Sequence, residues 1–259
     1  MTNQEFLNGF DVLYNNITSN QAPGLNPYEI SLFLTKAQYE ILKNYFSAKG
    51  NLKQEGFDES PKRQIDYSML IETANAVYVD GVGKVDPRAY KFKLPADLMY
   101  IINESVQFGG KTKVLRQVVP LSYEEYTRLM SQPFKEPTKY QAWRLITGKD
   151  KVEDKDVPTV DLIITSDDKD NYIVESNIGS SLTYSIRYVR KPKPIVLCDL
   201  SSIDRSLEIE GISVSTPCEL PAQLHEEILQ RAVELAKVAW TTTGQENTQL
   251  FIEAGKRSE

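Results

Sequence analysis

His225 is the only histidine of the chain, so any histidine chemistry depends on it. It opens the stretch "HEEIL", which begins like the zinc-binding motif HExxH, but Leu229 stands where the second histidine belongs. A catalytic histidine also needs a nucleophile that it activates, and no spacing in the sequence singles out a serine or cysteine for that role. The pattern therefore favours a solvated residue in the first turn of a helix.

Two other short stretches contain residue types that bind phosphate or calcium. "DGVGKV" has Gly-x-Gly-Lys from Gly81, whereas a phosphate-binding P-loop needs GxxxxGK followed by Ser or Thr, so a hairpin turn is favoured. "SDDKDN" alternates Asp168 and Asp170, but Tyr172 interrupts the series and no glycine follows, which favours a solvated loop over a calcium site. No pair of carboxylates stands out. We therefore expect no enzyme activity, no cofactor and no metal.

The bulk composition limits the function further. The net charge of −6 argues against a general nucleic-acid binder, because phosphate contacts need a basic surface. Cys198 and Cys218 allow one disulfide at most, and two small buried hydrophobic residues are the favoured interpretation. The first residues resemble neither a signal nor a transit peptide, and no apolar run approaches the about 18 residues that cross a membrane. We expect a protein that is made and kept in the cytoplasm, at least until it is assembled into something, and that does not bind membranes.

The two ends of the chain have helical periodicity. Apolar residues from Phe6 to Ile17 recur at spacings of three and four. A second helix is predicted from Pro27, with Asn26 as its cap and Glu29 three residues later. A third, shorter helix is predicted in "ESPKRQIDYSMLIETA", and a last one in "ELPAQLHEEILQRAVELAKVAW".

The middle of the chain changes to a period of two. Strands are predicted in "AVYVDGVGKV", "YKFKLP", "MYIINESVQF", "KVLRQVV", "TVDLIIT", "NYIVES" and "SLTYSIRYV". A short helix interrupts them at "SYEEYTRLM", where Ser122 and Glu125 form a capping box. In "YVRKPKPIVL", the prolines are expected to end a strand and to keep a sheet edge from pairing wrongly.

These elements predict an α+β fold. We expect a helical bundle formed by the N-terminal helices and the C-terminal helix, with a β-rich region inserted between them. The corresponding parts are residues 1–75 (helical), residues 76–215 (β-rich), and residues 216–259, a C-terminal helix and tail that complete the bundle. Tyrosine is the commonest aromatic residue, with 14 copies, and it suits protein interfaces and strands equally.

Five stretches, in order from about Asn26 to Trp240, resemble the ring, or head–tail adaptor, proteins of short-tailed phages, especially crAss-like phages. They are "NPYEISLFLTKAQYEIL" with "GFDESPKRQID", "KLPADLMYIINESV", "VVPLSYEEYTRLMSQPFKEP" with "AWRL", "IRYVRKPKPIVL" and "ELPAQLHEEILQRAVELAKVA". Each stretch alone is unspecific, and the ordered set carries the resemblance.

The resemblance implies a non-enzymatic structural protein of the virion, at the tail or the head–tail interface. Such proteins form rings, commonly of twelve copies, that stack below the capsid portal, continue the channel for DNA ejection and support tail components. The implied partners are further copies of the chain, the portal or adjacent ring proteins, and tail fibres or other tail components. Genomic DNA would pass through without sequence-specific binding. The alternative is a glycan- or receptor-binding module of a virion or a cell-surface assembly.

Two groups of residues are candidates for subunit contacts. Arg190, Lys191 and Lys193 bring positive charge to an acidic protein, and the resemblance suggests that they meet an acidic neighbour. Leu250, Phe251 and Ile252 are a small apolar cluster in a polar C-terminal stretch, which either packs on its own subunit, is disordered, or docks into a partner.

Overall fold

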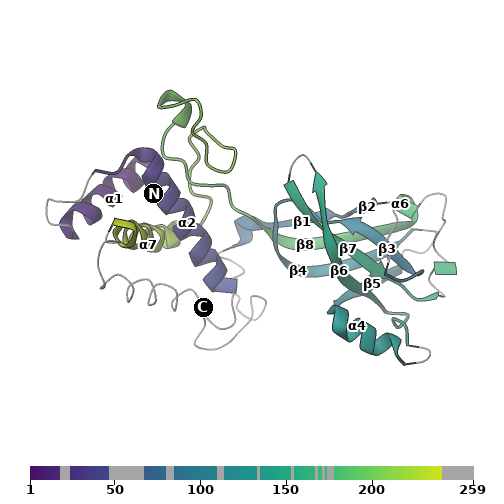
Figure 1. Ribbon diagram of the computed structural model, residues 1–259. Helices are drawn as coiled ribbons and strands as arrows, with labels where there is room; N and C mark the ends of the chain where they lie inside the picture. Colours follow the sequence, from purple (N-terminus) through teal and green to yellow (C-terminus); the bar gives the residue numbers. More distant parts are fainter. Residues whose placement is uncertain are drawn as a thin grey trace. The chain divides into compact units, whose positions relative to one another are not determined.

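The computed structural model describes residues 1–17, 24–46, 67–79, 85–109, 114–132, 135–152, 155–166, 169–170, 173 and 178–240. The chain divides into two compact units (Figure 1). The first, here the terminal unit, comprises Met1–Leu70 and Pro192–Glu259. The second, the sheet unit, is Ile71–Lys191. One unit is therefore made from both ends of the sequence and the other from one continuous segment.

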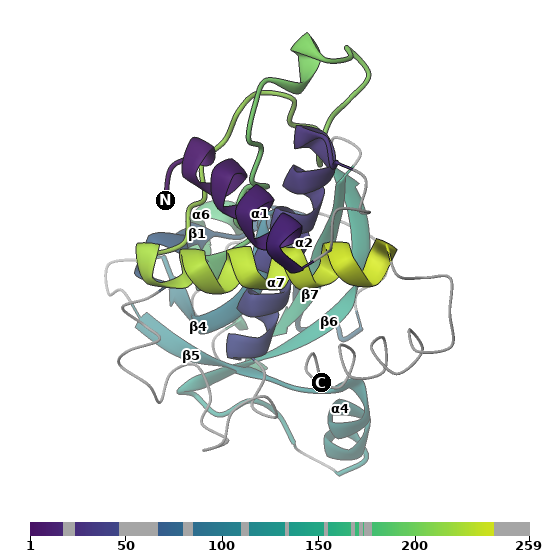
Figure 2. The same ribbon diagram turned by 90° about the vertical axis from the view of Figure 1, so that its left-hand side faces the viewer.

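The terminal unit contains the helices α1 (Asn3–Ile17), α2 (Pro27–Phe46) and α7 (Ala222–Trp240). Figure 2 shows α7 lying across α1 and α2, and it contacts both. The apolar faces of the three helices supply fully or almost fully buried side chains, among them Phe6, Phe10, Leu34, Leu42, Ile228 and Ala232. The helical periodicity predicted at both ends of the chain is confirmed by these three elements.

Reciprocal hydrogen bonds fix the start of α2. The Glu29 backbone N–H donates to Asn26 Oδ1, and the Asn26 N–H donates to Glu29 Oε2, both at 2.9 Å. Pro27 occupies the first helical position, where its missing N–H leaves no bond unmade. The predicted cap of this helix is therefore confirmed.

Polar residues on α2 hold the extended segment that follows the sheet unit. The Thr35 hydroxyl accepts from the Ile195 N–H at 3.1 Å, Ser31 Oγ accepts from the Leu197 N–H at 3.1 Å, and Gln38 Nε2 donates to the Lys193 carbonyl at 2.9 Å. Ser31, Thr35 and Gln38 are all buried, and they give this proline-containing backbone the partners that a neighbouring strand would otherwise supply.

Eight strands form the sheet unit: β1 (Ile71–Asn75), β2 (Val77–Val79), β3 (Ala89–Lys93), β4 (Leu98–Phe108), β5 (Val114–Pro120), β6 (Gln141–Val152), β7 (Lys155–Ile163) and β8 (Leu182–Arg190). Their order in the sheet is β1-β8-β4-β5-β6-β7-β3-β2. The pair β5–β6 is parallel, and the other described pairs are antiparallel. The short helix α6 (Ile178–Ser181) leads into β8.

The sheet nearly closes on itself. Its edge strands β1 and β2 are separated in the sequence by Ala76 alone, whose N–H donates to the Tyr184 carbonyl of β8 at 2.8 Å. Such a short connection between the edges forces the sheet to curl into a near-barrel. Across its interior the ring of Phe92 on β3 lies 5.4 Å from the ring of Tyr184 on β8, although these strands are far apart in the sheet order.

The interior of the near-barrel also contains a charged group. Glu104 accepts a hydrogen bond of 2.6 Å from the Tyr184 hydroxyl, and its Oε2 lies 3.0 Å from Arg144 Nε. Burial raises the pKa of Glu104, and the two partners oppose that shift. Burial and the neighbouring Glu104 raise the pKa of Tyr184.

Helix α4 (Tyr123–Met130) covers the outer side of the sheet over β3, β6 and β7. Its buried residue Tyr126 packs in a cluster with Trp143, Leu145 and Ile163, residues that face away from the interior. The Ser122–Glu125 capping box predicted for this helix is confirmed, because each side chain bonds to the other residue's backbone N–H.

The expected fold class, a helical bundle with an inserted β-rich region, is wrong. The protein is mostly β: an eight-stranded sheet nearly closes around its own core, and helices accompany it. Helical periodicity is visible within one short segment, whereas a closed sheet arises from pairing between distant strands, so the sequence pattern overstated the helices. A short helix was expected within residues 59–74. Residues 59–66 lie outside the described residues, and residues 68–74 form a single turn (Ser68–Leu70) followed by β1.

Candidate functional site

The three basic candidates lie around the end of β8. Arg190 is the last residue of the strand, and its Nε lies 2.9 Å from Glu72 Oε1 on β1. The Lys191 N–H donates to the Asp97 carbonyl at 2.7 Å. The strand ends before Pro192, as predicted. The prolines do not protect a sheet edge, however, because β8 pairs with β1 on one side and β4 on the other.

Lys193 belongs to the terminal unit and has a partner there. Its backbone N–H donates to Glu219 Oε2 at 3.0 Å, and its Nζ lies 4.0 Å from Glu219 Oε1. The side chain of Lys193 is 63% exposed, so this ion pair is screened by water. The candidates Leu250, Phe251 and Ile252 lie outside the described residues.

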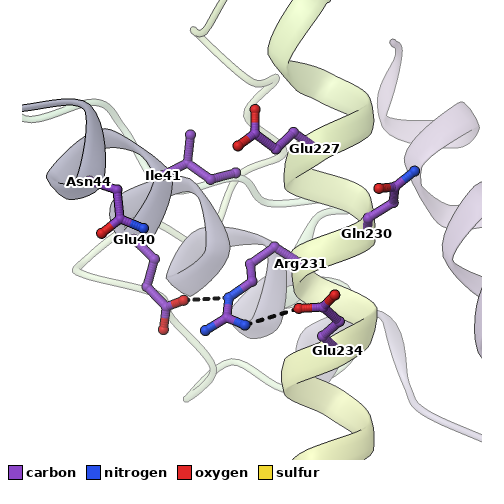
Figure 3. A pocket seen from close by; sticks show the side chains of 7 residues that line it. All are labelled: Glu40, Ile41, Asn44, Glu227, Gln230, Arg231 and Glu234. Carbon is purple, nitrogen blue, oxygen red and sulfur yellow. Dashed lines mark hydrogen bonds and ion pairs between the residues drawn. The ribbon is translucent and has the colours of Figure 1, made fainter. Parts of the chain in front are cut away.

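A pocket of about 210 Å³ opens between α2 and α7 in the terminal unit (Figure 3). Arg231 on α7 lies between two carboxylates, with its Nε 2.6 Å from Glu40 Oε2 and its Nη1 3.0 Å from Glu234 Oε2. Glu227 and Gln230 complete the α7 side. These carboxylates raise the pKa of Arg231 against the lowering effect of its burial.

The geometry of this pocket favours a structural role. Its guanidinium already makes two ion pairs, so both helices are joined through Arg231. Sequence reasoning missed this arrangement, because Glu40 and Arg231 are far apart in the chain. No local signal sets these two residues apart, because both helices carry several other charged residues.

His225 is buried, so its predicted place in solvent is wrong. Its side chain is 6% exposed, its Nε2 lies 2.8 Å from the Leu220 carbonyl oxygen, and its ring lies 5.3 Å from that of Phe6. The Met1 amino group lies 2.5 Å from Nδ1. Burial lowers the pKa of His225. Both ring nitrogens therefore have polar partners, and these contacts help to fix α7 within the terminal unit.

Cys198 and Cys218 are both free, and burial raises the pKa of the Cys218 thiol to about 11. Such a thiol is a poor nucleophile, since the thiolate is the reactive form. Across the described ranges, no group of His, Cys, Asp or Glu side chains has an arrangement that would hold a metal ion. Nor does any described helix combine the length and apolar character that a membrane span requires.

Comparison with known proteins decides the family. The family described as "Phage tail ring protein 3/4" matches residues 1–248. The chain belongs to this phage tail ring protein family. One relative, "Ring protein 4/5" of Bacteroides phage crAss001, is 48% identical over 261 aligned residues, covering 100% of both chains. A second, "Ring protein 3" of the same phage, is 29% identical and covers 93% of this chain and 97% of the relative.

For a tail ring protein, surfaces that meet other subunits are the relevant functional elements. The resemblance found in the sequence is thereby confirmed at the level of the family. The family points to a structural protein of the virion tail rather than to an enzyme.

Proposed function

We propose that this protein is a non-enzymatic subunit of a closed ring in a phage tail. The observation that carries the proposal is the full-length similarity to a ring protein, at 48% identity with no part of either chain left uncovered. Similarity over the whole length includes both units, so it supports a shared architecture and a shared role in assembly.

Membership of the same family supports a finer role. We propose a ring, of twelve copies, that stacks below the portal or on an adjacent ring, continues the DNA channel and supports tail fibres or other tail components. A closed ring needs heterologous contacts, in which each subunit presents two different faces. The net charge of −6 suits a channel through which DNA moves without being held.

Native mass spectrometry and electron microscopy of the purified protein, alone and mixed with the portal of its phage, test this function. We expect closed rings that stack on the portal. A stable monomer that ignores the portal and binds glycans would contradict the proposal and favour the receptor-binding alternative.

We further propose that the basic candidates contribute to contacts between subunits. Charge reversal at Lys191 and Lys193 should weaken ring assembly while leaving the circular dichroism spectrum unchanged, because both side chains are exposed. Reversal of Lys36, an exposed lysine on α2, is the matched control. Equal ring yields from all these variants would exclude the two lysines from the interface.

The C-terminal candidates have a separate test. If Leu250, Phe251 and Ile252 dock into a partner, a chain ending after Gly244 should fold normally but assemble poorly. A triple substitution of these residues by serine, in the full-length chain, distinguishes the apolar cluster from the rest of the tail. Unimpaired assembly of both variants would contradict docking.

A further inference from the structure

The outward side of β1, β8, β4 and β5 has an unusual composition. Inward-pointing side chains on these strands, such as Tyr184, Ile186 and Val106, form the interior core. The residues between them point outward and align in two cross-strand rows. The first row is Thr73, Arg187 and Asn103. The second is Asn75, Ser185, Ser105 and Gln117. We call these seven residues the polar face.

Arg187 is the only charged residue of the polar face. The other six carry hydroxyl or amide groups, although a quarter of the whole chain is charged. Within the described part of the chain, the exposed side chain of Arg187 has no hydrogen bond or ion pair. The centres of protein interfaces are depleted of Lys, Glu and Asp and enriched in Arg, and the polar face has the same bias. The polar face therefore has the composition of a contact surface.

An apolar residue borders this surface. Leu115 on β5 pairs with Gln107 of β4 and is 66% exposed. Hydrogen-bonding groups beside an exposed leucine can receive an amphipathic partner, whose aromatic ring covers the leucine while its polar groups meet the amides and hydroxyls.

Helix α4 lies on the other side of the near-barrel. It packs on the outer side of β3, β6 and β7, whereas the polar face centres on β8 and β4. The contact between Phe92 and Tyr184 across the interior places β3 opposite β8. The sheet unit thus has two different outer surfaces on opposite sides, as a head-to-tail ring contact requires.

The exposed side of α4 complements the polar face. Tyr123 is 64% exposed, and its exposed neighbours Glu124 and Glu125 make the first turn acidic. The helix is held firmly, because the buried Tyr126 hydroxyl donates to Asp86 Oδ2 at 3.1 Å and Asp86 also pairs with Arg88 at 2.9 Å. A fixed tyrosine and a carboxylate on one short helix form a small, rigid docking element.

We propose that the polar face of one copy receives helix α4 of the next copy around the ring, with Arg187 pairing with Glu124 of that neighbour and Tyr123 covering Leu115. This contact rests on the proposed ring function. The contact is heterologous, so its repetition closes a ring. It also places the positive charge of Arg187 against the acidic first turn of α4.

Charge exchange tests the pairing directly. Arg187→Glu and Glu124→Arg should each raise the subunit concentration needed for half-assembly by about tenfold, as expected for like charges placed together at an interface. The double variant, in which the charges are exchanged, should recover most of the loss. Arg205→Glu and Glu208→Arg, at exposed positions of the terminal unit, are the matched controls and should assemble like the wild type. Ring yield is read by native mass spectrometry at several concentrations.

A second measurement tests proximity without relying on charge. A chain carrying both Arg187→Cys and Glu124→Cys should form covalent oligomers up to the full ring with a short bis-maleimide cross-linker, whose spacer replaces the reach of the two long side chains. Each single variant, which keeps the native Cys198 and Cys218, should not form this ladder.

The outcomes separate this contact from the function on which it rests. Wild-type rings together with unchanged assembly of Arg187→Glu, or with no rescue in the double variant, would overturn the contact and leave the ring function standing. Rings that give no covalent ladder would do the same. Failure of the wild type to form rings, alone or with the portal, would overturn both.

Discussion

The two units of this protein bury polar groups in different ways. The terminal unit buries neutral groups, such as Ser31 and Thr35 of α2, which bond to an extended backbone segment. The sheet unit buries charge, with Glu104 and Arg144 inside the near-barrel. In the terminal unit, hydroxyl groups of α2 are enough to bond the backbone of one extended segment, Ile195–Leu197. In the near-barrel the strands already pair with one another, so the buried polar side chains form hydrogen bonds and ion pairs among themselves.

The largest effect is expected from breaking the charged group in the sheet unit. Glu104→Ala leaves the mostly buried Arg144 guanidinium without its carboxylate and should lower the free energy of unfolding by about 3–5 kcal/mol. Urea denaturation measures this loss. Gln117→Ala, at an exposed position of β5, is the control and should be nearly neutral. Equal stability of both variants would mean that the buried charges do not support the near-barrel.

A close helix contact gives the corresponding test in the terminal unit. A side chain added at Gly9 of α1 would place its Cβ 2.8 Å from Leu229 Cδ2 of α7, which is buried. Gly9→Leu should therefore lower the free energy of unfolding by about 1–3 kcal/mol through overpacking. Gly24→Ala, with open space around it, should change stability little. Thermal denaturation of Gly9→Leu, Gly24→Ala and the wild type measures these changes. An unchanged melting temperature for Gly9→Leu would show that α1 is free to move away from α7.

Loss of a helix cap should have a smaller effect. Ser122→Ala removes the acceptor for the Glu125 N–H and should lower the stability of α4 by about 1 kcal/mol. Hydrogen exchange should rise in the first turn of α4 and stay unchanged in the strands. Thr127→Ala, on the same helix but away from the cap, is the control. Faster exchange throughout the sheet would instead mean that α4 is part of the near-barrel's stability.

The smallest effect concerns pH and the terminal unit. The pKa of His225 is lowered by burial from its ordinary 6.5, so the unfolded chain takes up a proton first as the pH falls. His225 should therefore contribute its full stability above pH 6.5 and lose it as the pH falls below that value. His225→Gln should remove this part of the pH dependence of the melting temperature between pH 7.5 and 5.5. Parallel profiles for both proteins would contradict it.

Local signals in the sequence predicted the caps of two helices. The Asn26–Glu29 and Ser122–Glu125 pairs each lie within four residues, so a short window contains the whole capping arrangement. The period of two in "SLTYSIRYV" likewise predicted a strand, and β8 (Leu182–Arg190) confirms it.

The arrangement of the strands depends on long-range pairing and was not predicted. Nothing near Gln117 indicates its parallel partner Gln141, and nothing near Asn75 indicates that Ala76 joins the two edges of one sheet. The buried setting of His225 was missed for the same reason, since Phe6 and Met1 reach it from the other end of the chain. The interface candidates Arg190, Lys191 and Lys193 stay a prediction.

The discontinuous terminal unit has a consequence for biosynthesis. A chain made from its N-terminus has all eight strands translated before the first residue of α7. At about 5–20 residues per second, the ribosome leaves the near-barrel seconds in which to close while α1 and α2 still lack the helix that packs across them. Completion of the terminal unit is therefore the last folding step, and it requires that translation has passed Trp240, the last residue of α7. Truncated chains would carry a finished sheet unit and an unfinished partner, which makes them natural targets for proteolysis.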